Sequence, residues 1–195
     1  MGDETGPPRG RFTFRPTALA GVWEVDRRFL SDERGTFGRL YCAREFHDAG
    51  AVTGPIVQMN LSRTTKIGTV RGLHFQRSPG RETKVVTCRT GEVWDVVVDL
   101  RQSSPTFLEW HATLLDGVGQ TSLVVPPGCA QGFQTLTEDC ELLYLHTAEF
   151  DPSLDAGVLA TDPRLDLPWP LPISLMSERD QHLPRVAAAL RGGRD

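Results

Sequence analysis

The chain has 195 residues, of which 39% are hydrophobic and 24% charged, so it has ordinary globular composition and enough length for one domain with a conventional core. The 25 acidic residues outnumber the 21 Lys and Arg, for a net charge of −4, and the basic residues are scattered along the sequence. We therefore expect binding neither to nucleic acid nor to a membrane surface, although a few local positive charges could hold a small anion.

Both ends of the chain have the composition of tails. Residues 1–10 and 190–195 are mostly Gly, Pro and charged residues. We expect a flexible N-terminal tail over residues 1–10, one domain over 11–184, and a short tail or helix over 185–195. The start is polar and no run approaches the roughly 20 apolar residues of a membrane span, so we expect a cytoplasmic protein.

Short strands and one helix come first along the chain. Residues 12–14 and 23–25 alternate apolar and polar side chains, which is typical of strands, and residues 32–35 have turn composition. Residues 42–48, followed by Ala49-Gly50, predict a short helix.

The second half of the chain has strand composition between closely spaced turns. Segments rich in β-branched and aromatic residues cover 84–89, 93–100, 110–115, 122–125 and 141–146. A second short helix is expected only near 184–190, and strands without long crossover helices cannot easily form a parallel sheet. The sequence therefore predicts an all-β fold, a jelly-roll barrel or sandwich with a few short helices.

One segment places Arg71 and His74 three positions apart with Gly72 between them. On a regular strand, side chains at this spacing point to opposite faces of the sheet. A bulge at the glycine would be needed to bring both into one cavity. Taken alone, a single His near a strand is more often structural than catalytic.

The metal-binding pattern of cupin barrels is incomplete in this chain. Its first motif needs Gly, five residues and then His-x-His, whereas the chain has Gly68, His74 and Gln76; its second motif ends in His, whereas the chain has Gln131. One imidazole cannot hold a transition metal by itself. The four cysteines include no Cys-x-x-Cys pair. We therefore expect a cupin-type barrel without a metal.

An ordered series of motifs resembles the dTDP-4-dehydrorhamnose 3,5-epimerases and related epimerases of deoxysugar biosynthesis. The series comprises residues 32–35, 58–62, 71–76, 84–86, 91–101, 103–106, 126–133, 143–144, 162–163, 169–170 and 177–180. The resemblance implies epimerisation, without a cofactor, at C3, C5 or both of a dTDP-4-keto-6-deoxyhexose. The reaction abstracts a proton next to the ketone and returns one from the opposite face.

The resemblance also implies four catalytic residues. His74 matches the base, and Asp180 matches the partner that fixes its tautomer and stabilises the imidazolium. Lys84 matches a cation aimed at the enolate oxygen, and Tyr144 matches the acid on the opposite face. Without the resemblance, each of the four would more simply be a structural or surface residue.

Substrate-binding residues follow from the same resemblance. Arg34 and Arg71 match phosphate ligands, because the donors of a guanidinium group form a planar fork. Gln58 and Asn60 match residues near the sugar or the nucleotide. The full expected binding set is Arg34, Phe37, Gln58, Asn60, Arg71, Gln131 and Glu149.

The chain departs from the family pattern in four places, one of them a pair of residues, and all four are expected to face the site. Gln131 replaces a His, Arg39 a Glu, and Ala160 a Trp, while Glu149 and Phe150 replace a pair of tyrosines. Because the four catalytic residue types are retained, we expect epimerisation to persist with altered selectivity. The altered selectivity could be inversion of C3 or C5 alone, or action on a 4-keto sugar that has already been modified.

Two alternative functions and the oligomeric state are left open. A 3,4-ketoisomerase would move protons on the same class of substrate, and a non-catalytic sugar-nucleotide-binding cupin would bind without turnover. Family members are homodimers that exchange N-terminal strands, which residues 12–14 and 23–25 could supply here.

Overall fold

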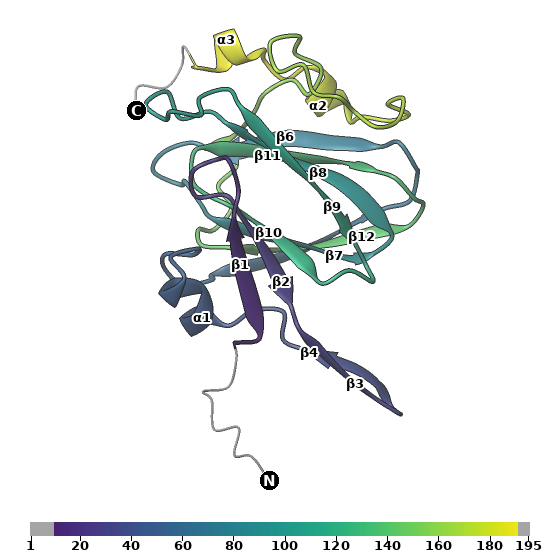
Figure 1. Cartoon of the computed structure of the whole chain (residues 1–195). Helices are drawn as coiled ribbons and strands as arrows, with labels where there is room; N and C mark the ends of the chain where they lie inside the picture. The colour runs from purple at the N-terminus through teal and green to yellow at the C-terminus, as the bar shows by residue number, and fades with distance from the viewer. Residues whose placement is uncertain (1–9, 191–195) are drawn as a thin grey trace.

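The computed structural model describes residues 10–190 and consists mainly of two antiparallel sheets that face each other (Figure 1). One sheet has the order β1 (Phe12–Pro16), β2 (Trp23–Arg27), β10 (Thr121–Val125), β7 (Lys84–Thr90), β12 (Cys140–His146), β5 (Gln58–Thr64). The other has the order β13 (Asp155–Gly157), β6 (Val70–Gln76), β11 (Cys129–Thr135), β8 (Glu92–Asp99), β9 (Trp110–Asp116). The predicted all-β jelly-roll fold is confirmed.

The predicted strands of the second half are all present, as β7, β8, β9, β10 and β12. The predicted N-terminal strands are β1 and β2, and β2 pairs with β10 of the same chain. Strands β5, β6, β11 and β13 were not predicted, because their sequences are polar or interrupted by glycine.

Within residues 10–190, three short helices flank the sandwich. Helix α1 (Ala43–Asp48) begins after Cys42, and Gly50 at φ +70° follows its end, as the turn signal predicted. Helices α2 (Glu178–Gln181) and α3 (Val186–Ala189) lie in the C-terminal segment next to the five-stranded sheet (Figure 1). Helix α3 falls within the expected range 184–190, and its Val186 is fully buried.

Apolar side chains fill three layers of the molecule. One cluster, including Leu123 and Phe133, lies between the two sheets. A second joins the five-stranded sheet to the C-terminal segment through residues such as Val98 and Val186. In the third, Phe46 of α1 packs against β2, β7 and β10. Complete burial of such a ring contributes about 1.5–3 kcal/mol to the stability of the fold.

The domain boundaries stay a prediction, and residues 1–9 and 191–195 of the expected tails lie outside the described residues.

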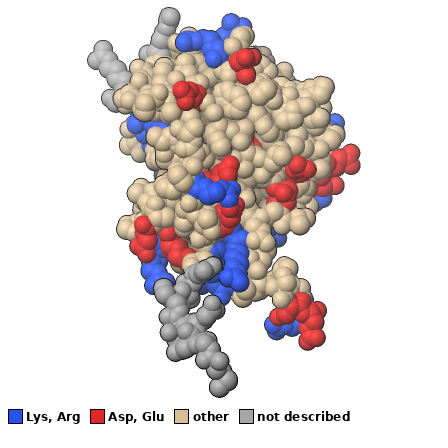
Figure 2. All heavy atoms as spheres, viewed as in Figure 1, with Lys and Arg blue, Asp and Glu red and all other residues tan. Residues whose placement is uncertain are grey.

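A two-stranded hairpin projects away from the sandwich. It consists of β3 (Phe29–Asp32) and β4 (Gly35–Gly38) and extends well beyond the sheets (Figure 1). Acidic and basic side chains are interspersed over the face of the molecule shown in Figure 2, including the far end of this hairpin. This distribution agrees with the charge pattern of the sequence.

Candidate active site

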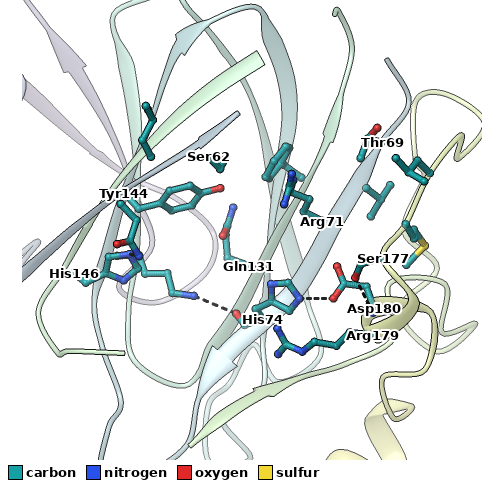
Figure 3. A pocket seen from close by; sticks show the side chains of 17 residues that line it. Ser62, Thr69, Arg71, His74, Gln131, Tyr144, His146, Ser177, Arg179 and Asp180 are labelled. Carbon is teal, nitrogen blue, oxygen red and sulfur yellow. Dashed lines mark hydrogen bonds and ion pairs between the residues drawn. The ribbon is translucent and has the colours of Figure 1, made fainter. Parts of the chain in front are cut away.

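A pocket of about 490 Å³ lies between the two sheets, and the segment that contains α2 closes one side of it. Its walls come from β5, β6, β7, β11, β12 and residues 175–180 (Figure 3). This volume suits a small-molecule ligand. Seven of the predicted site residues line it: Asn60, Arg71, His74, Lys84, Gln131, Tyr144 and Asp180.

A bulge in β6 brings Arg71 and His74 into this pocket. Opposite β11, His74 pairs with Gln131 and Arg71 pairs with Phe133, so two residues of β6 face one residue of β11 between them. Gly72 lies in the bulge at φ +128°, and a Cβ there would lie 2.6 Å from the Cα of Gly132. Only glycine fits this position. The bulge required by the sequence is therefore confirmed.

His74 and Asp180 form a hydrogen-bonded pair in the pocket. His74 Nε2 lies 2.7 Å from Asp180 Oδ1, and the backbone N–H of Gly72 donates to Asp180 Oδ2 at 3.2 Å. Asp180 is held in the first turn of α2, where its own N–H donates to the Ser177 hydroxyl. Burial raises the pKa of Asp180, but the bonds from His74 and Gly72 outweigh it and leave this pKa below its usual value.

The ionised Asp180 carboxylate decides which nitrogen of His74 can act as a base. Because Asp180 only accepts hydrogen bonds when ionised, His74 Nε2 carries the proton of this pair. Nδ1 is then the nitrogen that can accept a proton.

Lys84 reaches the pocket from the first position of β7. Its side chain is buried rather than an exposed strand-end lysine. Its Nζ lies 3.4 Å from the backbone oxygen of His74, to which it donates, and 3.4 Å from Glu82 Oε1. The ammonium group is therefore held beside the strand that carries the candidate base.

Gln131 pairs with a buried acid. Its Nε2 donates to Asp95 Oδ2 at 2.7 Å, and Asp95 is fully buried in β8. Burial raises the pKa of Asp95 well above its usual value, against the lowering effects of Gln131 and Lys84. Asp95 Oδ1 has no hydrogen-bond partner among residues 10–190. The neutral acid is the favoured form of a carboxyl group in such a place.

Tyr144 points its hydroxyl into the pocket from the wall opposite His74 (Figure 3). Burial raises the pKa of the Tyr144 phenol. The phenol therefore keeps its proton at neutral pH, as a proton donor requires.

His146 is a pocket residue that the sequence analysis missed. Its Nδ1 lies 2.7 Å from Glu82 Oε2, and its Nε2 lies 3.4 Å from Asn60 Nδ2. The ring stacks on that of Tyr144, with centroids 6.1 Å apart and planes at 24°. Alternation along the strand could have revealed it, because residues two positions apart in β12 share a face.

Two guanidinium groups line the pocket beside the base and its partner. The exposed Arg71 donates from Nε to Thr64 Oγ1 at 2.9 Å, and Arg179, also missed by the sequence analysis, pairs with Asp155 at 2.6 Å. Such groups suit an anion that carries several oxygens.

Four predicted binding residues do not line the pocket of their own chain. Arg34 and Phe37 lie in the projecting hairpin, where Arg34 pairs with Asp32. Gln58 accepts from the backbone N–H of Phe150, and the backbone oxygen of Glu149 accepts from Gln76. These last two contacts tie the loop after β12 to neighbouring strands.

The expectation that all four departures face the site is wrong within this chain. Of these positions only Gln131 lines the pocket. Arg39 forms an ion pair with Glu45 of α1 at 2.9 Å. Ala160 is 1% exposed and belongs to the cluster under the C-terminal segment, where its oxygen accepts from the Trp169 indole. Glu149 and Phe150 are exposed on the loop after β12.

Residues 10–190 contain no group of three or more His, Cys, Asp or Glu side chains placed to hold a metal ion. In the same part of the chain, no helix is both long and apolar enough to cross a membrane. That the reaction needs neither metal nor cofactor stays a prediction.

Known proteins match nearly the whole chain. Residues 16–188 match the family model for dTDP-4-dehydrorhamnose 3,5-epimerase. A dTDP-4-dehydrorhamnose 3-epimerase of Streptomyces niveus is 38% identical over 92% of this chain and 86% of the relative. NovW, a 4-keto-6-deoxy sugar epimerase from the novobiocin biosynthetic gene cluster of Streptomyces spheroides, has a TM-score of 0.89 at 36% identity, over 98% of this chain and 96% of its own.

A further solved structure contains a nucleotide. The dTDP-4-dehydrorhamnose 3,5-epimerase of Bacillus anthracis, with TDP and pyrophosphate bound, has a TM-score of 0.86 at 35% identity, over 89% of this chain and 99% of its own. Family model, sequence and fold agree. The chain therefore belongs to the dTDP-4-dehydrorhamnose 3,5-epimerase family.

Proposed function

We propose that this chain inverts C3, C5 or both of a dTDP-4-keto-6-deoxyhexose without a cofactor, in the biosynthesis of a deoxysugar. The observation that carries the proposal is that His74, paired with Asp180 at 2.7 Å, and Tyr144 face one pocket from opposite walls. A base on one face of a carbon and an acid on the other are what inversion of its configuration requires.

The proton steps balance without any further reagent. His74 Nδ1 takes the proton from the carbon next to the C4 ketone, and the electron pair moves onto the ketone oxygen as an enolate. The Lys84 ammonium stabilises this negative charge. The Tyr144 hydroxyl then gives its proton to the opposite face of the carbon and the ketone reforms. Solvent takes the proton from His74 and restores the one on Tyr144.

The charged substrate fits the arginines beside the base. Arg71 and Arg179 line the same pocket as His74, so a diphosphate bound there would place the attached sugar near the base. The nucleotide in the Bacillus anthracis structure supports a dTDP-linked substrate. Gln131 provides an amide where the family pattern has an imidazole, and we propose that this change narrows which carbon is inverted.

We also propose that the protein works as a homodimer. In the projecting hairpin, Phe37 is 72% exposed and Leu30 is 48% exposed, which is unusual for large apolar side chains on one short element. A second copy that covers them would let Arg34 and Phe37 reach the pocket of the partner subunit. Light scattering that shows a monomer at working concentration would contradict this.

Incubation with dTDP-4-keto-6-deoxyglucose in deuterated water tests the function. We expect deuterium at C3, at C5 or at both, located by NMR of the product. No incorporation at either carbon would reject this substrate. A carbonyl that has moved to C3 would indicate a ketoisomerase, and binding without exchange would indicate a non-catalytic protein.

A further inference from the structure

A second histidine–carboxylate pair lies in the pocket, away from His74 and Asp180. His146 and Lys84 are direct cross-strand neighbours on β12 and β7. Glu82 lies two residues before Lys84 and contacts both of them: its Oε2 is 2.7 Å from His146 Nδ1 and its Oε1 is 3.4 Å from Lys84 Nζ. All three residues are buried, with side chains 7% exposed for Glu82, 10% for His146 and 11% for Lys84.

The two contacts of Glu82 differ in strength. A hydrogen bond of 2.7 Å to a carboxylate is short, whereas a separation of 3.4 Å between ammonium and carboxylate leaves room for closer approach. In a buried place, the attraction between these opposite charges is strong. His146 therefore holds the Glu82 carboxylate at a distance from the Lys84 ammonium group that is longer than a close ion pair.

The other side of Lys84 faces the candidate base. Its Nζ donates to the backbone oxygen of His74, and the nearby Asp95 is favoured in its neutral form because burial raises its pKa. Glu82 is thus the charged acid with the stronger hold on this ammonium group. Closer pairing with Glu82 would reduce the positive charge available to an enolate.

We propose that His146 is a positioning residue for Lys84: by binding one oxygen of Glu82, it keeps this carboxylate from drawing the ammonium group out of the pocket. Only the expected effect of His146 on kcat rests on the proposed function. The arrangement of the three side chains is independent of the reaction.

Three variants test the proposal by their kinetics. His146→Leu removes the donor to Glu82, so kcat should fall about tenfold with KM changed less than about twofold. Adding Glu82→Gln to this variant removes the carboxylate that captures Lys84, and kcat should return to within about threefold of the parent. His146→Gln keeps a donor to Glu82 and should stay within about threefold of the parent.

Each variant can overturn the proposal. Loss of kcat in H146Q equal to that in H146L would mean that His146 itself carries a proton or contacts the substrate. Failure of E82Q to rescue H146L would mean that Glu82 does not act on Lys84. Unchanged kcat in H146L would exclude any role. His111→Leu is the matched control, because His111 also pairs with a glutamate, Glu24, at 3.0 Å but does not line the pocket.

An NMR measurement separates this proposal from the proposed function. The chain has only two lysines, Lys66 and Lys84, so protein made with lysine labelled at Cε with carbon-13 gives two signals. The Lys84 signal should shift in H146L and in E82Q, and stay in place in H146Q and H111L, while exposed Lys66 stays in place throughout. A Lys84 signal unmoved by H146L, or by E82Q if H146L does not fold, overturns the proposal whether or not any sugar is turned over.

Discussion

The pocket between the sheets and the hairpin β3–β4 contain different parts of the predicted site. The pocket brings together all four predicted catalytic side chains from β6, β7, β12 and α2 of one chain. The hairpin projects away from the sandwich (Figure 1), and its Arg34 and Phe37 are exposed. One chain therefore holds the residues predicted for the proton chemistry, whereas nucleotide binding by Arg34 and Phe37 would require the homodimer proposed above.

The largest expected effect comes from the base. His74→Asn should lower kcat by at least about 10³-fold and abolish deuterium exchange at every position, because His74 is the proposed base for proton abstraction. Product NMR in deuterated water measures this. His111→Asn should leave exchange intact, and exchange that survives in H74N would remove His74 from its role.

The partner of the base comes next. Asp180→Asn should lower kcat about 10²-fold or more, because the neutral amide no longer stabilises the imidazolium.

Asp180 should also make stability depend on pH. Since the pKa of Asp180 is lowered in the folded chain, its ionisation stabilises the fold at pH values above the usual aspartate pKa of about 3.9. This contribution should disappear as pH falls through that value toward the lowered pKa.

Urea unfolding across pH measures the contribution of Asp180. The difference in free energy of unfolding between the parent chain and D180N should be constant near pH 7 and should shrink below about pH 4. A difference that grows on acidification would contradict the ionised state of Asp180.

A mixing experiment tests whether the hairpin acts on a second copy. Arg34→Ala with Phe37→Ala should lower kcat/KM about 30-fold, mainly through KM, with little loss of stability because both side chains are exposed. Equal amounts of this variant and H74N, mixed so that subunits exchange, should regain activity in dimers with one complete site. Activity no higher than the sum of the separate variants would place both functions in one chain.

The smallest effect is expected at Arg39. Its partner Glu45 lies on α1, and an ion pair on the surface contributes about 0.2–1 kcal/mol. Arg39→Ala should therefore change kcat/KM less than about twofold and lower thermal stability only slightly. A large rise in KM would indicate that Arg39 contributes to substrate binding, as the family pattern predicted.

Residues 84–146 show how much of the fold could be predicted from composition. Valine-rich and aromatic segments identified β7, β8, β9, β10 and β12 because such side chains favour strands without help from distant residues. Strand β11, with the sequence Cys-Ala-Gln-Gly-Phe-Gln-Thr, was missed. It forms because it pairs with β6 on one side and β8 on the other, and those partners come from elsewhere in the chain.

The sequence by itself determined the family and singled out the four residues predicted to be catalytic, because the ordered motifs can be recognised along the chain. Only the tertiary structure decided which side chains meet. The bulge at Gly72 turns Arg71 and His74 into one pocket, and α2 brings Asp180 to within 2.7 Å of His74 from far along the chain. Folding also joined His146 to Glu82 and buried Ala160 away from the site. The motifs identify which residue types are present. The distances between their side chains and the burial of each side chain, which set their pKa values and hydrogen bonds, arise only when the sheets pack.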